Sequence, residues 1–173
     1  MSENNSQNQE QFGIDENTKS SNFLNFNGGF SKGFLTKVAK EEVGKDEGNK
    51  YTVLSFTFMD HEGLRMFKHT EFIPDSTGDN YAKVRNGVNS RIKHIYEIYK
   101  SVDKETGLGK GATSWPDFYE KVANAFNTGN NGNPIFRKLE GEKLVAIPVW
   151  LKITFVTKGK RKGNTQFPLI PPF

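Results

Sequence analysis

The hydrophobic periodicity of the chain changes twice, and this order constrains the fold more than any other feature of the sequence. Apolar residues alternate in three segments before residue 74, recur every three or four positions from Tyr81 to Val102, and alternate again from Leu144. Alternation is typical of strands with one buried face, whereas the wider spacing is typical of an amphipathic helix. The sequence therefore predicts strands, then helices, then strands again.

Three strands in meander order are predicted first: Gly33–Lys40, Tyr51–Met59 and Leu64–Ile73. The middle strand has the clearest alternation, with Leu54, Phe56 and Phe58 on one face. The turn between the second and third strands is Asp60–Gly63, so these two form a hairpin.

Two helices follow. The apolar stripe from Tyr81 to Val102 predicts the first, and Ser114 is placed to cap the second, with Pro116 in its first turn. Between them lies the glycine-rich segment Gly107–Thr113, which is expected to be a flexible loop.

The last strands are predicted at Leu144–Thr157 and Phe167–Phe173. Five strands with a helix between the third and the fourth match the layout of the OB-fold, a small Greek-key barrel. We therefore expect a mainly β, five-stranded OB-fold-like barrel over residues 28–173, with a helical insertion at about residues 79–127. A β-sandwich, or an α+β sheet packed on two helices, would give a similar order of elements.

The N-terminal residues are almost wholly polar. Met1–Asn22 has a net charge of −3, and Phe12 and Ile14 are its only sizeable apolar side chains after Met1. So little apolar surface does not offset the entropy of ordering the chain. Residues 1–27 are therefore expected to be a disordered, acidic polar arm.

Positive charge is concentrated in two regions, although the whole chain carries only +4. Tyr81–Lys104 has a net charge of +4, and Leu144–Phe173 contains five basic residues and no acidic one. A basic segment without compensating acids is typical of a surface that contacts phosphates.

Several classes of chemistry are absent from the sequence. There is no cysteine, so disulfides, iron–sulfur clusters and cysteine-based zinc sites are excluded. The loop Gly107–Thr113 lacks the spacing of a phosphate loop, and His61, His69 and His94 lack the spacing of metal ligands. No catalytic residue, metal site or cofactor is expected, and the chain is expected not to be an enzyme. No secretory signal or membrane-spanning apolar run is present, so we expect a soluble intracellular protein.

Nucleic-acid binding is the chemistry that the outward strand positions favour, because single strands are bound by cations along the phosphates and by aromatic faces under the bases. If Leu64, Met66 and Phe72 face inward on the third strand, the intervening residues, Glu71 included, face outward. The candidate nucleic-acid-binding residues are Lys32, Lys37, Arg65, Phe67, His69, Trp150, Lys152, Lys158, Lys160, Arg161 and Lys162.

Phe67, Trp150 and the basic cluster each have a structural alternative. Phe67 belongs to the core if the register of its strand slips by one residue, and Trp150 packs under the helices if its strand turns the other way. Independently of these two residues, the alternative for the cluster Lys158–Lys162 is a solvated hairpin tip.

The strings Gly33–Val38, Tyr51–Phe58, Phe67–Phe72, Val149–Ile153 and Phe167-Pro168 resemble the OB-fold single-stranded DNA-binding proteins of tailed bacteriophages. The resemblance implies a protein that coats single strands during phage DNA replication or recombination in the host-cell cytoplasm, without sequence preference. It is compatible with replication proteins as further partners and with an oligomer, and it implies no membrane; RNA is an alternative ligand. Many such proteins end in an acidic tail, whereas Phe167–Phe173 contains no acid and the acidic arm lies at the N-terminus.

A second hypothesis is a phage structural or assembly protein. In this case the β-domain would form a protein–protein interface anchored by Trp150 and the proline-rich C-terminal segment.

Overall fold

A computed structural model describes residues 10–19, 31–60, 66–98, 100–102, 104–127, 137–138, 145–151, 154–155, 165–166 and 169–170. The strands are β1 (Ser31–Val43), β2 (Tyr51–Asp60), β3 (Met66–Phe72), β4 (Arg137–Lys138), β5 (Val145–Leu151), β6 (Thr154–Phe155), β7 (Thr165–Gln166) and β8 (Leu169–Ile170). The helices are α1 (Tyr81–Glu97), α2 (Trp115–Asn127) and the short 3₁₀ helix η1 (Glu47–Asn49).

The main sheet is antiparallel, with the strand order β3-β2-β1-β5-β4 and β8 paired to β5. β1 is the longest strand because it pairs with β2 along most of its length and with β5 over Ser31–Leu35. β6 and β7 form a separate pair, so the single strand expected over Leu144–Thr157 is two strands in different sheets.

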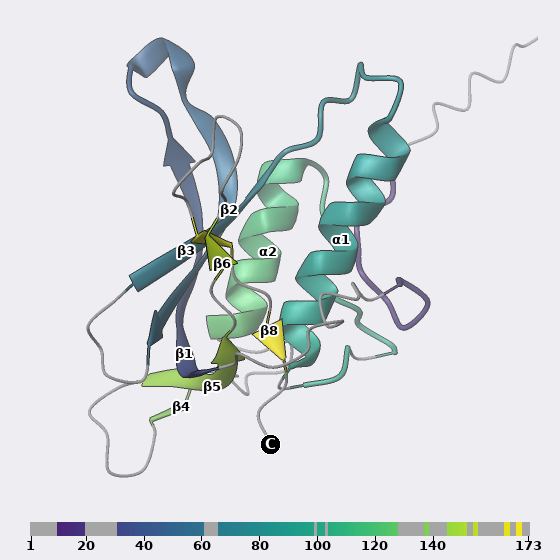
Figure 1. Ribbon diagram of the computed structural model, residues 1–173. Helices are drawn as coiled ribbons and strands as arrows, with labels where there is room; N and C mark the ends of the chain where they lie inside the picture. Colours follow the sequence, from purple (N-terminus) through teal and green to yellow (C-terminus); the bar gives the residue numbers. More distant parts are fainter. Residues whose placement is uncertain are drawn as a thin grey trace, which may run out of the picture.

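Both helices lie on one side of β1, β2 and β3, with α2 between the sheet and α1 (Figure 1). The ring of Phe126 on α2 meets Phe56 on β2 at a centroid distance of 5.8 Å and Tyr96 on α1 at 5.2 Å. Asn127 also donates a hydrogen bond from Nδ2 to the carbonyl oxygen of Val38, 3.2 Å away. One aromatic side chain thus links all three layers of the core.

The second helix forms as its sequence predicts. The amide of Asp117 donates to Ser114 Oγ at 3.3 Å, which caps the first turn, and Phe118 and Val122 are buried. The three residues expected on the inner face of β2, Leu54, Phe56 and Phe58, are likewise fully buried.

The closed five-stranded barrel expected from the element order is wrong. Among the described strands, β3 and β4 lie at opposite edges of the main sheet, and no pairing joins β3 to β4 or to β8. The sheet is open and two helices cover one face, as in the α+β alternative. The physical reason is that the inner aromatic side chains of β2 pack on α2, as Phe56 does, so the sheet needs no closure to bury them.

Residues 10–19 differ from the disordered arm expected over residues 1–27. Ile14 is fully buried, and its backbone forms two hydrogen bonds with Leu108, of 2.8 and 2.7 Å. Phe12 packs edge-on against Trp115 at 5.4 Å. Lys93 on α1 also donates hydrogen bonds from Nζ to the carbonyl oxygens of Glu16 and Thr18, at 2.8 and 2.7 Å. Apolar contacts with the core and polar contacts with α1 thus hold this segment together.

The glycine-rich loop is packed rather than flexible. Leu108 is fully buried between two glycines with positive φ, Gly107 (62°) and Gly109 (69°). A Cβ at Gly109 would lie 2.5 Å from two ring carbons of Phe118. Only glycine allows the loop to approach α2 this closely.

Gly109→Ala is expected to destabilise the fold by roughly 2–4 kcal/mol, because it adds a steric clash to the cost of a left-handed backbone. Gly111→Ala is the matched control, since Gly111 has φ +77° but open space around its Cα, and should cost only about 1–2 kcal/mol. Urea denaturation of both variants measures the difference, and equal losses would contradict the packing role of Gly109.

Candidate nucleic-acid interface

The strand register sorts the residues of β1, β2 and β3 onto two faces. Residues paired across antiparallel strands share a face, and successive residues alternate. Lys40, Leu54 and Glu71 form one row across the three strands, and contacts with α1 and α2 mark their face as the inner one. The opposite face is called the outer face below. Its described positions are Phe34, Lys37, Ala39, Glu41, Val43, Tyr51, Val53, Ser55, Thr57, Met59, Met66, Lys68, Thr70 and Phe72. Val53, Ser55 and Thr57, in the middle strand, are buried.

Two lysines and a glutamate form the centre of the outer face. Lys37 and Lys68 flank Thr57 in one row, and their side chains are 62% and 47% exposed. Glu41 accepts a hydrogen bond from Lys68 Nζ at Oε2, 2.7 Å, and one from Lys37 Nζ at Oε1, 3.4 Å. The hydrogen bond from Lys68, opposed by partial burial, lowers the pKa of the Glu41 carboxyl. The carboxylate is therefore ionised and bridges two cations.

An aromatic pair lies at one end of the outer face. Tyr51 and Phe72 are 58% and 52% exposed, and their rings meet edge to face with centroids 6.4 Å apart. At the other end of β3, Met66 is also exposed. Exposed aromatic surface beside cations is the combination that single-stranded nucleic acids require.

The register adds two of the sequence-predicted residues to the outer face. Lys32 pairs with Trp150 across β1 and β5, and Phe34, two positions further along β1, pairs with both Met59 and Pro148. Met59 lies two positions from Thr57 on β2, so all of these backbone positions belong to the outer face. Lys32, Lys37 and Trp150 are thereby brought to one side of the sheet.

The orientation expected for β3 is wrong. Met66 and Phe72, expected inward, are exposed on the outer face, whereas Glu71, expected outward, is only 3% exposed on the inner face. His69 also lies on the inner face, where its ring is tilted by 38° against that of Phe56 with a centroid distance of 6.0 Å. Phe67 pairs with the inner residue Phe58. The β3 strand therefore has the alternative register, shifted by one residue, in which Phe67 occupies a position on the core side. His69 and Phe67 do not belong to the outer face.

A network of ionic hydrogen bonds explains why a glutamate occupies an inner position. Arg91 on α1 donates from Nε and Nη2 to the two carboxylate oxygens of Glu71, at 2.6 and 2.7 Å, and His69 Nε2 lies 2.7 Å from Oε1. Burial disfavours the charged form, but these hydrogen bonds outweigh it and lower the pKa of Glu71. Alternation of polar and apolar residues cannot reveal such a pair, because Arg91 lies on another element.

The remaining candidates, Arg65, Lys152, Lys158, Lys160, Arg161 and Lys162, lie outside the described residues. Conversely, sequence reasoning missed Lys68, Tyr51 and Phe72 as members of the outer face. The available signal was the alternation Met66, Lys68, Thr70, Phe72, read with the opposite orientation.

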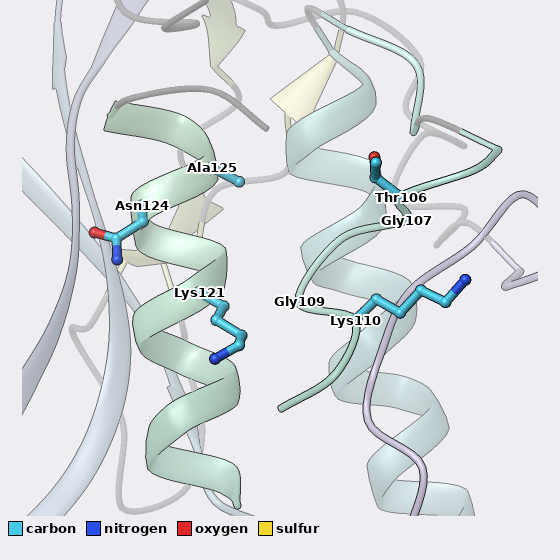
Figure 2. A pocket seen from close by; sticks show the side chains of 7 residues that line it. All are labelled: Thr106, Gly107, Gly109, Lys110, Lys121, Asn124 and Ala125. Carbon is cyan, nitrogen blue, oxygen red and sulfur yellow. The ribbon is translucent and has the colours of Figure 1, made fainter. Parts of the chain in front are cut away.

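The hollow between the glycine-rich loop and α2 is a weaker candidate (Figure 2). It has a volume of about 230 Å³ and is lined in part by Lys110 and Lys121. Lys110 extends away from α2 and donates to the carbonyl oxygen of Glu105, and Lys121 is paired with Asp117 at 2.8 Å. Both cations are already engaged, so this hollow does not have the features of a phosphate site.

Comparisons of the chain with protein-family models, curated proteins and solved structures find no match. Within the described residues, no cluster of three or more His, Asp or Glu side chains is suited to hold a metal ion. None of the described helices combines the length and the apolar character needed to cross a membrane.

Glu71→Gln is expected to destabilise the protein by roughly 2–3 kcal/mol at neutral pH, because it leaves Arg91 without its charged partner. The folded state holds Glu71 with a lowered pKa, so its contribution is complete above the ordinary glutamate pKa and is lost as the pH falls through the lowered one. The variant should therefore lose less stability than the wild type on acidification.

Urea denaturation across the acidic range measures both effects. Glu120→Gln is the control, since Glu120 forms a more exposed ion pair with Lys40 and should cost less than about 1 kcal/mol. Parallel stability–pH curves for wild type and Glu71→Gln would contradict the assignment.

Proposed function

We propose that the protein binds single-stranded nucleic acid, DNA in the first place, across the outer face of its sheet. The observation that carries the proposal is the exposed Tyr51–Phe72 pair, which shares with Lys37 and Lys68 the face opposite the described helices α1 and α2. Aromatic rings supply stacking surfaces for bases of any sequence, and the lysines supply contacts for phosphates.

The register supports a surface that extends from β3 to β5. Lys32 and Trp150 occupy paired positions on this face, so cationic and aromatic positions recur along its width. An extended path of this kind suits a flexible single strand better than a compact ligand, because successive nucleotides repeat the same base and phosphate groups.

The biological role that goes with this binding is the coating of transient single strands in DNA replication or recombination, in the host-cell cytoplasm if the chain is a phage protein. The protein then acts by binding alone, with no reaction of its own. This role rests on the resemblance of the strand sequences to phage single-stranded DNA-binding proteins, and the resemblance does not extend to their barrel, which the described strands do not form.

The double variant Lys37→Ala/Lys68→Ala tests the phosphate contacts. It should weaken binding of labelled oligothymidine about tenfold or more at low salt and reduce the slope of log affinity against log salt by about two, because two phosphate contacts are lost. Fluorescence anisotropy titrations at several salt concentrations measure both quantities.

Lys40→Ala/Lys121→Ala is the matched control, because it removes the same charge from partly exposed lysines away from the outer face. An equal loss in both double variants would indicate only a general charge effect. No binding of the wild type to DNA or RNA at low salt would refute the function, and self-association through the outer face would then favour the assembly-protein alternative.

Tyr51→Leu/Phe72→Leu tests the stacking surface. Each base stack contributes roughly 1–3 kcal/mol, so the affinity should fall at least about tenfold while the salt slope stays unchanged. Met66→Ala is the control for loss of exposed apolar surface on β3. A change in slope without a change in affinity at low salt would contradict a stacking role.

A further inference from the structure

The Glu41 carboxylate occupies the space between two lysines that the proposed function requires to be available. Each of its oxygens accepts from a different ammonium group, Oε2 from Lys68 and Oε1 from Lys37. A non-bridging pair of phosphate oxygens would make the same two contacts, because phosphate and carboxylate are both oxyanions that accept from lysine.

The hydrogen bonds of Glu41 to the two lysines cross one intervening row of the sheet. Lys37 and Lys68 share the row of Thr57, whereas Glu41 lies in the row of Val53 and Phe72. The row between them consists of Ala39, Ser55 and Thr70, which all have small side chains. Glu41 and Lys68 therefore reach toward each other across a strip of small residues, with Phe72 at the Glu41 end.

We propose that Lys37 and Lys68 form a phosphate-binding site of the outer face, and that Glu41 occupies this site in the free protein and is displaced by a phosphodiester group of the nucleic acid. The proposal rests on the proposed function. It adds an internal competitor, so that Glu41 limits the affinity of the face for single strands.

The energies are compatible with displacement. Lys37 and Lys68 are 62% and 47% exposed, and Glu41 is 22% exposed. Water therefore reaches both lysines and screens their pairing with Glu41, and the long side chains lose entropy when they pair, so the net contribution of these ion pairs is small. The Glu71–Arg91 pair on the inner face is different, because Glu71 is buried and makes two short bonds to one guanidinium. The outer ion pairs of Glu41 therefore open at a lower cost than the buried Glu71–Arg91 pair.

The position of the aromatic pair supports the assignment. Phe72 shares the row of Glu41, and Tyr51 contacts Phe72. A phosphate that replaces the carboxylate would thus lie on the strip between the lysines and the stacking surface. This is the order in which backbone and base occur within one nucleotide.

The test compares Glu41→Gln with the wild type in anisotropy titrations with oligothymidine. Glu41→Gln should bind about two- to fivefold more tightly at low salt. In this variant the phosphate no longer has to displace a carboxylate from Lys37 and Lys68. Glu120→Gln is the matched control: it removes the same charge and a lysine ion pair of the same 2.7 Å length on the inner side of the sheet. Its affinity should stay within about 1.5-fold of the wild type.

Two further variants separate competition from net charge. Glu41→Asp keeps the negative charge, but its shorter side chain extends less far toward Lys37 and Lys68. This variant should therefore also bind oligothymidine more tightly than the wild type. In a Lys37→Ala/Lys68→Ala background, Glu41→Gln should give no gain, because the site that it frees is gone. Thermal melting of each variant identifies any that fail to fold, and the Asp variant then stands in for Gln.

The outcomes are distinct. A gain for Glu41→Gln without a gain for Glu120→Gln, lost in the double-alanine background, supports the proposal. Equal affinities of wild type and Glu41→Gln, or a gain that persists without the lysines, overturn it and leave the proposed function intact. A wild type that binds no single strand at low salt overturns both.

Discussion

The register of β2 between β1 and β3 is the constraint on which the rest of the structure depends. It directs Leu54, Phe56 and Phe58 into the layer that α2 covers, and by the same alternation it directs Tyr51 and Thr57 to the other side. A slip of one residue would exchange the two faces. The core contact between Phe56 and Phe126 therefore fixes the composition of a surface that neither ring touches.

Sequence patterns predicted those structural elements that are determined by residues close together in the chain. The alternation in β2 and the cap at Ser114 depend on neighbours within a few residues, and the structure confirms both. The apolar stripe predicted the first helix, but α1 ends at Glu97 rather than at Val102, and Val84 of the stripe is exposed. The orientation of β3 depends on partners far away in the chain, since Arg91 makes an inner position acceptable for Glu71. The same holds for the open sheet, which follows from packing on α2 rather than from the order of strands.

The residues of the candidate site show the same difference between what local sequence predicts and what distant partners determine. Lys37 was predicted directly, and the pairing of β1 with β5 brings Lys32 and Trp150 to its face. Phe67 and His69 were assigned to the wrong side by one residue, and Lys68, Tyr51 and Phe72 replace them. Residue type was enough to state a hypothesis about the kind of ligand, but only strand pairing indicated which side chains lie on the same face.

The two backbone hydrogen bonds between Ile14 and Leu108 have a consequence for folding during synthesis. A ribosome synthesises the N-terminal segment first, yet its place in the core exists only after the loop before α2 has been made. Closing so large a loop is entropically unfavourable, so local contacts of the hairpin and the helices form earlier. Residues 10–19 are thus synthesised before the loop that contains Leu108 and dock only after that loop has been made.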